Sequence, residues 1–425
     1  MKSLRRFKNS RAVICLTLFC AAAQPWTYAS VEGPLNAKGR SLNTSGGQTF
    51  TSFGGSMTDI SETARLYDAG IWHHRPEIIQ TLLPRVREIG GGMRLVLMYR
   101  DQFIVLEDEE SRENNESVGG FNTAPESWFL HDGKGKRVPV PDYHEDYYGE
   151  KGQRRWFMDP GNADFRSYWI DKTLKHVDEG NWDGVFVDDV LLTLTAHRLE
   201  PGQIATYKDD ASFQQAVLGF LREITRRTRE IYGRGEGRKI IIPNISLSYD
   251  YDPAVLRDFL NAADGYMEEH HVTAWAWGEH AARRQMEALR QARHLGKHVF
   301  LLTYADPSSG VPNLLETSLS AYLVALAGYP NAYWSFRSDE YAPFNERPAF
   351  EFWAGRGLGQ PRPEIEFYNA EGVRLDSSQE SVIWLRRFDN GIAVVNLTAA
   401  RQSLTINGES LQLKPFQGKL KAASV

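Results

Sequence analysis

The sequence predicts an α/β fold, a (β/α)8 TIM barrel followed by a small C-terminal antiparallel β-domain. Eight short apolar segments alternate with amphipathic helical stretches through the middle of the 425-residue chain. Two of these segments end in adjacent carboxylates, as expected where barrel strands reach an active-site face. The alternative architecture is an open doubly wound sheet.

The expected elements follow in order after a Gly-, Ser- and Thr-rich lead that covers residues 33–55. The expected barrel strands cover residues 66–72, 93–99, 155–158, 184–188, 239–245, 265–268, 298–304 and 332–336. The expected helices between them cover residues 76–89, 164–179, 212–232, 253–262, 281–295 and 313–326. This span is near the roughly 250 residues that such a barrel needs.

Beyond residue 355 the pattern becomes that of a β-sandwich-like domain. Short alternating segments are separated by Asp389-Asn390-Gly391 and by Asn407-Gly408, and such dipeptides are strong hairpin signals. The sequence therefore predicts three parts: a leader over residues 1–29, a catalytic barrel over 30–355 and a β-domain over 356–425.

The N-terminus has the features of a cleaved secretory signal peptide. Several Lys and Arg residues precede an apolar run over residues 12–23, which is shorter than the ~20 residues that span a bilayer. We expect a secreted or periplasmic protein without a membrane span in the mature chain. Both cysteines, Cys15 and Cys20, lie in the leader, so the mature chain is expected to have no disulfide and no thiolate metal site.

The net charge of −5 becomes more negative when this basic leader is removed. An acidic protein is a poor partner for nucleic acid or for an anionic membrane. The many aromatic residues suit sugar stacking, although a large core explains them equally well. We expect a carbohydrate partner and no cofactor, and the sequence leaves the oligomeric state open.

The strongest functional signal is a pair of carboxylate doublets. The segment 183–188 enters a strand with Asp-Gly and stops on Asp188 and Asp189, and the segment 264–269 repeats this pattern and ends on Glu268 and Glu269. Acids at two strand ends of one sheet are what glycosidic bond cleavage needs, with Asp188 ionised and Glu269 protonated. Strand alternation predicts that only one acid of each doublet faces the pocket. Taken alone, a strand-end Asp could instead cap the next helix.

Other polar or aromatic residues follow the predicted strands and suit a sugar pocket, which combines hydrogen-bonding groups with an aromatic face. These candidate substrate-binding residues are Tyr99, Asp101, Asp159, Asn244, His271, Tyr304, Asp306 and Trp334. Each has another reading, because Asp159 could cap a helix, Asn244 could close a turn and Trp334 could belong to the core.

The segment from Trp156-Phe-Met-Asp159-Pro-Gly through Asp183-Gly-Val-Phe-Val-Asp188-Asp189 resembles the barrels of hypothetical glycosyl hydrolase family fifteen. More distantly, the chain is similar to endo-α-1,4-polygalactosaminidase barrels and to α-amylase and α-galactosidase barrels. The resemblance implies a nucleophile at the fourth strand, on Asp188 or its neighbour Asp189. It implies a general acid/base at the sixth strand, on Glu269 or Glu268, and retention of configuration, often at an α-linkage.

Two other classes of function remain open from the sequence. One is a barrel that binds the polysaccharide of an envelope or exopolysaccharide system without cutting it. The other is a metal hydrolase, deacetylase-like or built on Asp188, Glu269 and His271, although adjacent histidines, as in His73-His74 and His270-His271, rarely ligate one ion together. One of these histidines could instead bind sugar or tune an acid. The sequence does not identify the sugar, the linkage or the mode of attack along the polymer.

Overall fold

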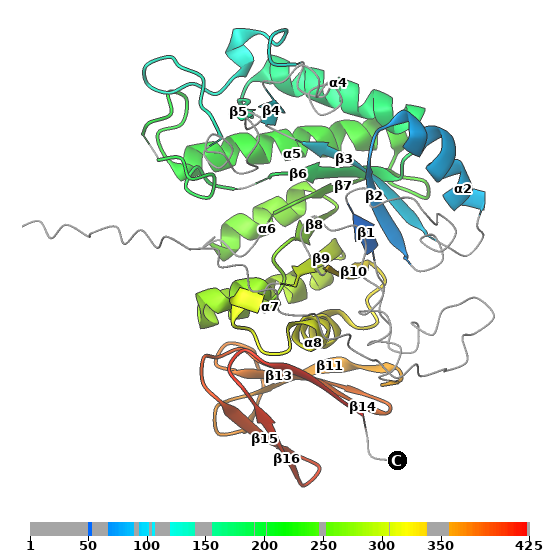
Figure 1. Ribbon diagram of the computed structural model, residues 1–425, viewed down its shortest axis with the longest axis vertical. Coiled ribbons are helices and arrows are strands. Elements are labelled where there is room, and N and C mark those ends of the chain that lie inside the picture. The colour runs from blue at the N-terminus through cyan, green and yellow to red at the C-terminus, as the bar shows by residue number, and fades with distance from the viewer. Residues whose placement is uncertain are drawn as a thin grey trace, which may run out of the picture. The chain divides into compact units, whose positions relative to one another are not determined.

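The computed structural model describes residues 50–52, 67–88, 93–101, 104–106, 120–140, 155–190, 192–200, 202–245, 252–305, 307–337 and 357–422. Within these residues, eight parallel strands form the sheet of a barrel (Figure 1): β1 Phe50–Ser52, β2 Ala69–His73, β3 Leu95–Asp101, β6 Gly184–Asp188, β7 Ile240–Pro243, β8 Gly265–Glu268, β9 His298–Tyr304 and β10 Ala332–Arg337. The order β1-β2-β3-β6-β7 continues through a parallel bridge between Asn244 and Met267 into β8-β9-β10. Because β1 also contacts β10, the strand order closes on itself, as in a barrel and not an open sheet.

Helices connect these strands in the order that the amphipathic pattern predicts. They are a π-helical turn η2 Ile78–Leu82 with α2 Leu83–Glu88, then α4 Ala163–Glu179, α5 Asp210–Tyr232, α6 Pro253–Ala262, α7 Glu279–His294 and α8 Leu314–Leu326. Caps begin several of them: the Asn162 side chain accepts from Phe165 N–H, and Asp209 forms a capping box with Ser212. Each described helix is too short or too polar to cross a bilayer.

Strand alternation sorts the core into two layers. Ile71, Leu97, Phe186, Ile242 and Met267 point into the barrel and pack against one another. Their chain neighbours point outward and pack with the helices. This regular in-and-out pattern also decides which polar side chains reach the barrel mouth.

The repeated Asp-Gly pattern lies at the start of the strands, away from the carboxylates that end them. The Asp183 carboxylate accepts from Val96 N–H at 2.8 Å, and the Asp264 carboxylate accepts from Ile241 N–H at 3.0 Å. A Cβ atom on Gly184 would lie 2.1 Å from the carbonyl oxygen of Ile240. The Asp of this pattern therefore hydrogen-bonds the start of its strand to the neighbouring strand. The Gly has no side chain at the point where the backbone of the adjacent strand is closest.

One predicted barrel strand is wrong. Residues 155–158 supply β5 Arg155–Phe157, which pairs antiparallel with β4 Ile104–Leu106 in an excursion between β3 and β6. The first barrel strand is instead β1, which lies in the Gly-, Ser- and Thr-rich lead. No strand was predicted there, because this segment has no apolar run. The exchange leaves the strand count unchanged, so β6 is the fourth barrel strand and β8 the sixth.

The C-terminal residues form the expected antiparallel β-structure, in a five-stranded sheet and a separate hairpin. The sheet order is β12-β11-β13-β14-β17, with β11 Pro361–Tyr368, β12 Arg374–Leu375, β13 Ile383–Phe388, β14 Gly391–Asn396 and β17 Gly418–Ala422, and the hairpin joins β15 Gln402–Ile406 to β16 Glu409–Leu413. The predicted turns at Asn390-Gly391 and Asn407-Gly408 close two hairpins.

This sheet packs on α8, which lies between it and barrel strands β9 and β10 (Figure 1). The guanidinium of Arg386 is buried and donates to the carbonyl oxygens of Val324 at 2.7 Å and Ala325 at 3.3 Å at the end of α8. Such donors satisfy carbonyls that have no partner inside the helix. The predicted leader and the predicted boundary at residues 355 and 356 lie outside the described residues.

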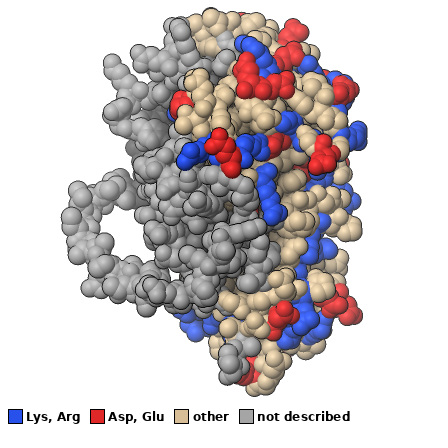
Figure 2. All heavy atoms as spheres, turned by 90° about the vertical axis from the view of Figure 1, so that its right-hand side faces the viewer, with Lys and Arg blue, Asp and Glu red and all other residues tan. Residues whose placement is uncertain are grey.

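Acidic and basic side chains are interspersed over the described part of the face drawn in Figure 2. Mixed charges of this kind weaken any extended potential of one sign on that face.

Candidate active site

Polar side chains from five neighbouring strands meet at the C-terminal end of the barrel. The side-chain amide of Asn244, just after β7, donates to Asp188 Oδ1 at 2.8 Å and to Glu269 Oε2 at 2.7 Å. Asn244 is buried and its backbone N–H donates to Val187 O, which holds it level with the end of β6. One amide group therefore joins the carboxylates that end the fourth and sixth barrel strands.

Two tyrosines hold the other oxygen of each carboxylate. The hydroxyl of Tyr99 in β3 donates to Asp188 Oδ2 at 2.6 Å, and that of Tyr304 in β9 donates to Glu269 Oε1 at 2.7 Å. Both oxygens of each acid accept a hydrogen bond, so both carboxylates are fixed in orientation before substrate arrives. Preorganised dipoles of this kind need no rearrangement during a reaction.

Asp101 and Asp189 enlarge the acidic group. Asp101 is the register partner of Asp188 on the neighbouring strand, and carboxylate oxygens of Asp101, Asp188 and Asp189 all lie within 4.8 Å of one another. Burial, and then the charges of Glu269 and Asp101, raise the pKa of Asp188 to about 7. Burial and the charge of Asp188 also raise the pKa of Asp189 well above its usual value. This group of acids is thus arranged to retain protons near neutral pH.

The two carboxylate doublets differ in how many of their side chains reach the group of acids. Glu268 follows the strand alternation, because its side chain is fully buried on the outer side of β8, while Glu269 joins the group of acids. The expectation that one acid of each doublet turns away is wrong for Asp188 and Asp189. Asp189 lies beyond β6 with φ 56°, and this left-handed turn brings its carboxylate back to the group.

We expect Asp189→Asn to stabilise the fold at alkaline pH, because burial and the charge of Asp188 disfavour the ionised form of Asp189. A gain of about 1–2 kcal/mol is in the range of single stabilising substitutions. The folded state raises the pKa of Asp189, so between pH 3.8 and that raised value the folded protein binds a proton that the unfolded chain has released. The wild type therefore loses stability as pH rises, and the Asn variant avoids this loss. Asn also tolerates the left-handed backbone.

Urea unfolding of the wild type and Asp189→Asn at pH 8 and near pH 4 measures the difference. The gain should be present at pH 8 and should nearly vanish near pH 4. A gain that is equal at both pH values would contradict the assigned cause.

Three predicted substrate-binding residues lie away from the carboxylates. Trp334 is buried on the outer side of β10, where Nε1 donates to Ser318 Oγ at 2.8 Å, and Tyr333 points inward instead. His271 is also buried against α8, with Nε2 3.3 Å from Ser318 O, and burial lowers its pKa to about 3. The alternative metal site built on Asp188, Glu269 and His271 is therefore not assembled by these side chains.

Asp159 is the third such residue. It lies in the turn after β5, where its carboxylate accepts from Tyr207 O–H and from Gly161 N–H. The helix that follows is capped by Asn162, so Asp159 fixes the turn instead of capping the helix. Asp306 lies outside the described residues.

Two residues near the acids were not predicted. His73 ends β2 and points inward, with its ring centroid 4.3 Å from that of Tyr99, and burial lowers its pKa to about 4. The strand-end rule could have found it. Arg155 in β5 supplies a positive charge that opposes the raised pKa of Asp101 and Asp189. It comes from the excursion, where no local pattern indicates such a role.

The acidic group is better suited to proton chemistry than to a metal ion. Asp101, Asp188 and Asp189 could together offer three oxygen ligands. The protons of Tyr99 O–H and Asn244 N–H, however, point at the two Asp188 oxygens. These donors occupy one lone pair on each Asp188 oxygen, so a cation would have to share this carboxylate with both of them.

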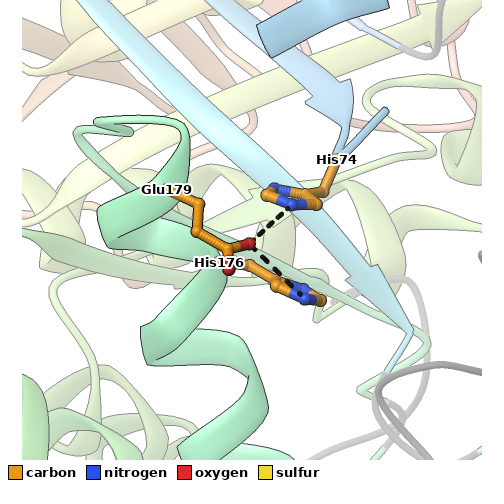
Figure 3. A group of neighbouring side chains, drawn as sticks. All are labelled: His74, His176 and Glu179. Carbon is orange, nitrogen blue, oxygen red and sulfur yellow. Dashed lines mark ion pairs between the residues drawn. The ribbon is translucent and has the colours of Figure 1, made fainter. Parts of the chain in front are cut away.

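A second group, His74, His176 and Glu179, lies on the outer side of the barrel (Figure 3). The distances from Glu179 Oε2 to Nε2 of His74 and of His176 are 3.4 and 3.9 Å, and the imidazoles stack at 4.1 Å with an interplanar angle of 11°. Since imidazole lone pairs lie in the ring plane, two nearly parallel stacked rings cannot both point at one ion. Trp182 N–H also faces His74 Nδ1 at 3.4 Å, which favours a proton on Nε2. This arrangement does not fit a metal centre.

An eight-stranded parallel barrel with paired acids at its strand ends is an arrangement that glycoside hydrolases use. The chain belongs to hypothetical glycosyl hydrolase family 15, whose family model matches residues 95–392. The match includes Asp101, Asp188, Asn244, Glu269 and Tyr304, and the family implies a carbohydrate substrate. No curated protein matches the chain.

Solved structures with a similar fold include carbohydrate-active enzymes. A maltogenic α-amylase from Thermotoga neapolitana aligns over 88% of this chain and 96% of its own, at 12% identity and a TM-score of 0.44. A family GH36 α-galactosidase from Geobacillus stearothermophilus aligns over 88% of this chain and 55% of its own, at 12% identity and a TM-score of 0.47. A cycloisomaltooligosaccharide glucanotransferase from Paenibacillus sp. aligns over 61% of this chain and 38% of its own, at 14% identity and a TM-score of 0.41.

Proposed function

We propose that this chain is an exported, retaining glycoside hydrolase that cleaves a poly- or oligosaccharide. In this proposal Asp188 is the nucleophile and Glu269 is the general acid/base. The observation that carries the proposal is the single Asn244 amide that donates to both acids.

That shared amide limits the separation of the acids. Asp188 Oδ1 and Glu269 Oε2 can be no further apart than the two hydrogen bonds laid end to end, about 5.5 Å. Retaining glycosidases hold their carboxyl groups about 5–5.5 Å apart, whereas inverting enzymes need about 6.5–9.5 Å to admit a water molecule. The bound therefore favours attack by Asp188 itself over activation of a water molecule by a distant base.

The reaction balances as a double displacement. Asp188 attacks the anomeric carbon, the glycosidic bond breaks and Glu269 donates its proton to the leaving oxygen. Glu269 then accepts a proton from water, which attacks the anomeric carbon and releases Asp188. The positive charge that develops on the sugar favours ionised Asp188, as does the hydrogen bond from Tyr99.

The raised pKa of Asp188 revises the expectation that this acid is already ionised in the free enzyme. With a pKa of about 7, Asp188 is largely protonated in mildly acidic solution. Productive binding then requires the proton of the pair to lie on Glu269, next to the leaving oxygen. The shared Asn244 amide keeps Glu269 close enough to Asp188 for its charge to raise the pKa of Asp188.

The export part of the proposal rests on the N-terminal sequence, where a basic segment precedes an apolar run that is too short for a membrane span. It places the protein in the periplasm or outside the cell, where polysaccharides are accessible.

The test of the proposed function is hydrolysis of a panel of bacterial exopolysaccharides and of α- and β-linked aryl glycosides by the mature protein. We expect new reducing ends from at least one polymer, unaffected by chelator. Binding without cleavage across the whole panel would contradict hydrolysis and favour a polysaccharide-binding barrel. Activity lost with chelator and restored by a metal ion would favour a metal hydrolase.

A further inference from the structure

Trp277 is a largely exposed aromatic side chain in an ordered part of the fold. Its exposed fraction is 62%, whereas Trp275, two residues earlier, is fully buried. Among the described residues the other strongly exposed large apolar side chains are aliphatic, Ile231 and Val373. Trp277 ends the 3-10 helix η6 Thr273–Trp277, which belongs to the loop that follows β8 and Glu269.

The loop that carries Trp277 is fixed by the buried side chain of Gln285 in α7. Gln285 Oε1 accepts from Val272 N–H at 2.9 Å and from Trp275 Nε1–H at 2.8 Å, and its Nε2 donates to His270 O at 3.3 Å. Thr303 Oγ1 in β9 donates to His271 O at 3.0 Å. The chain between Glu269 and Trp277 is thus hydrogen-bonded to α7 and to β9.

The backbone of this loop is also strained. Val272 has φ 58° and ψ −26°, a left-handed conformation that β-branched residues rarely adopt. Strain of this kind persists only where the surroundings impose it, and it is concentrated at functional sites. The strained backbone at Val272 therefore marks the loop that carries Trp277 as a candidate functional segment.

The loop lies on the active-site face. It begins at the strand end that supplies Glu269, and η6 packs against η7 Pro307–Ser309, which follows the strand of Tyr304. A 3-10 helix rises about 2 Å per residue, so the four steps from Thr273 to Trp277 span about 8 Å along the axis of η6. Trp277 ends this helix, eight residues beyond Glu269 on the same loop.

We propose that Trp277 is a stacking platform for a pyranose ring of the substrate, at a binding position remote from the cleaved bond. The flat face of an indole matches the apolar C–H face of a sugar ring, and its N–H offers a polar edge. This inference rests on the proposed function, since it names a polymeric substrate for the same site. It implies that long chains bind more tightly than short ones.

The test compares Trp277→Ala and Trp277→Tyr with the wild type on a long polymer and on the shortest oligosaccharide that is cleaved. For Trp277→Ala we expect KM for the polymer to rise about tenfold, typical for truncation of a central aromatic contact, with kcat nearly unchanged. Kinetics on the short substrate should stay at the wild-type level, and Trp277→Tyr should restore most of the polymer affinity. Equal changes on both substrates, or none, would overturn the platform.

Ile231→Ala in α5 is the matched control, because Ile231 is 56% exposed and lies at the helix end far along the chain from η6. It should leave KM for both substrates unchanged. Thermal unfolding of all variants shows whether the fold is retained, and a rise in KM in the control would contradict a specific role for Trp277.

Binding separates this inference from the proposed function. Retardation of Glu269→Gln in gels that contain the polymer measures affinity without cleavage, and adding Trp277→Ala should weaken it about tenfold. If the wild type cuts no polymer but Trp277→Ala still weakens binding, the platform stands and the hydrolase proposal fails. If polymer is cut but this binding is unchanged, the platform fails alone. If nothing binds, the platform is also overturned.

Discussion

Replacing Glu269 with Gln should lower kcat/KM for a polysaccharide by about a thousandfold or more, since a positioned general acid contributes about 10²–10⁴. Gln is nearly isosteric, and its amide oxygen can accept from Asn244 while its N–H donates to the Tyr304 hydroxyl, so the site should remain intact. An aryl glycoside with a good leaving group needs no proton in its first step. Its first turnover by Glu269→Gln should therefore remain much faster than polymer cleavage.

Asp188→Asn should abolish turnover of both kinds of substrate, because no leaving group compensates for a missing nucleophile. Asp258→Asn and Glu371→Gln make the same chemical changes on exposed acids in α6 and in the turn before β12, and both should keep wild-type activity. Initial rates on the polymer and the aryl glycoside test these four variants and Asp189→Asn. Loss of activity in Asp189→Asn with activity kept in Asp188→Asn would reassign the nucleophile.

Gly184→Ala should destabilise the fold by about 4 kcal/mol or more, a loss expected only from severe core strain. A Cβ atom there would lie 2.1 Å from Ile240 O and 2.8 Å from Ile240 N, and both are backbone atoms of the neighbouring strand. Relief would require β6 and β7 to separate, which would also displace Asp188 and Asn244. Urea unfolding, or the yield of folded protein, measures the effect.

Gly235→Ala is the matched control for this prediction. Gly235 lies in the turn after α5, and a Cβ atom there meets nothing within 4 Å. The change should be neutral or slightly stabilising, because it reduces the freedom of the unfolded chain. Equal stability of the Gly184 and Gly235 variants would show that the strands can separate at little cost.

The acid pair could be predicted because it depends on a local rule. Asp188 and Glu269 each end a short apolar strand, and parallel strands of one barrel deliver their ends to one face. The same alternation that turns Phe186 and Met267 inward turns the acids two residues later inward. Tyr99, Asn244 and Tyr304 follow the same rule, and each reaches an acid.

The predictions that were wrong concern residues whose positions are set by tertiary packing, which no local sequence pattern reveals. The side chain of Trp334 turns outward because Tyr333 occupies the inner position of β10, and this phase is set by tertiary packing. Asp189 reaches the acids through a left-handed turn, which overrides strand alternation. The segment 155–158 is as apolar as a barrel strand but pairs in an excursion, whereas β1 is short and polar and takes its place through pairing with β2.

In the proposed mechanism Asp188 attacks the sugar, and Glu269 first donates a proton to the leaving oxygen and then accepts one from water. The most direct measurement is mass spectrometry of Glu269→Gln quenched during turnover of an activated aryl glycoside of the sugar identified in the panel. Without its general base the variant should accumulate a covalent intermediate, so the peptide that contains Asp188 should carry the mass of one glycosyl unit. A glycosyl unit on Asp101 or Asp189, or cleavage that releases the inverted anomer without any adduct, would contradict the claim.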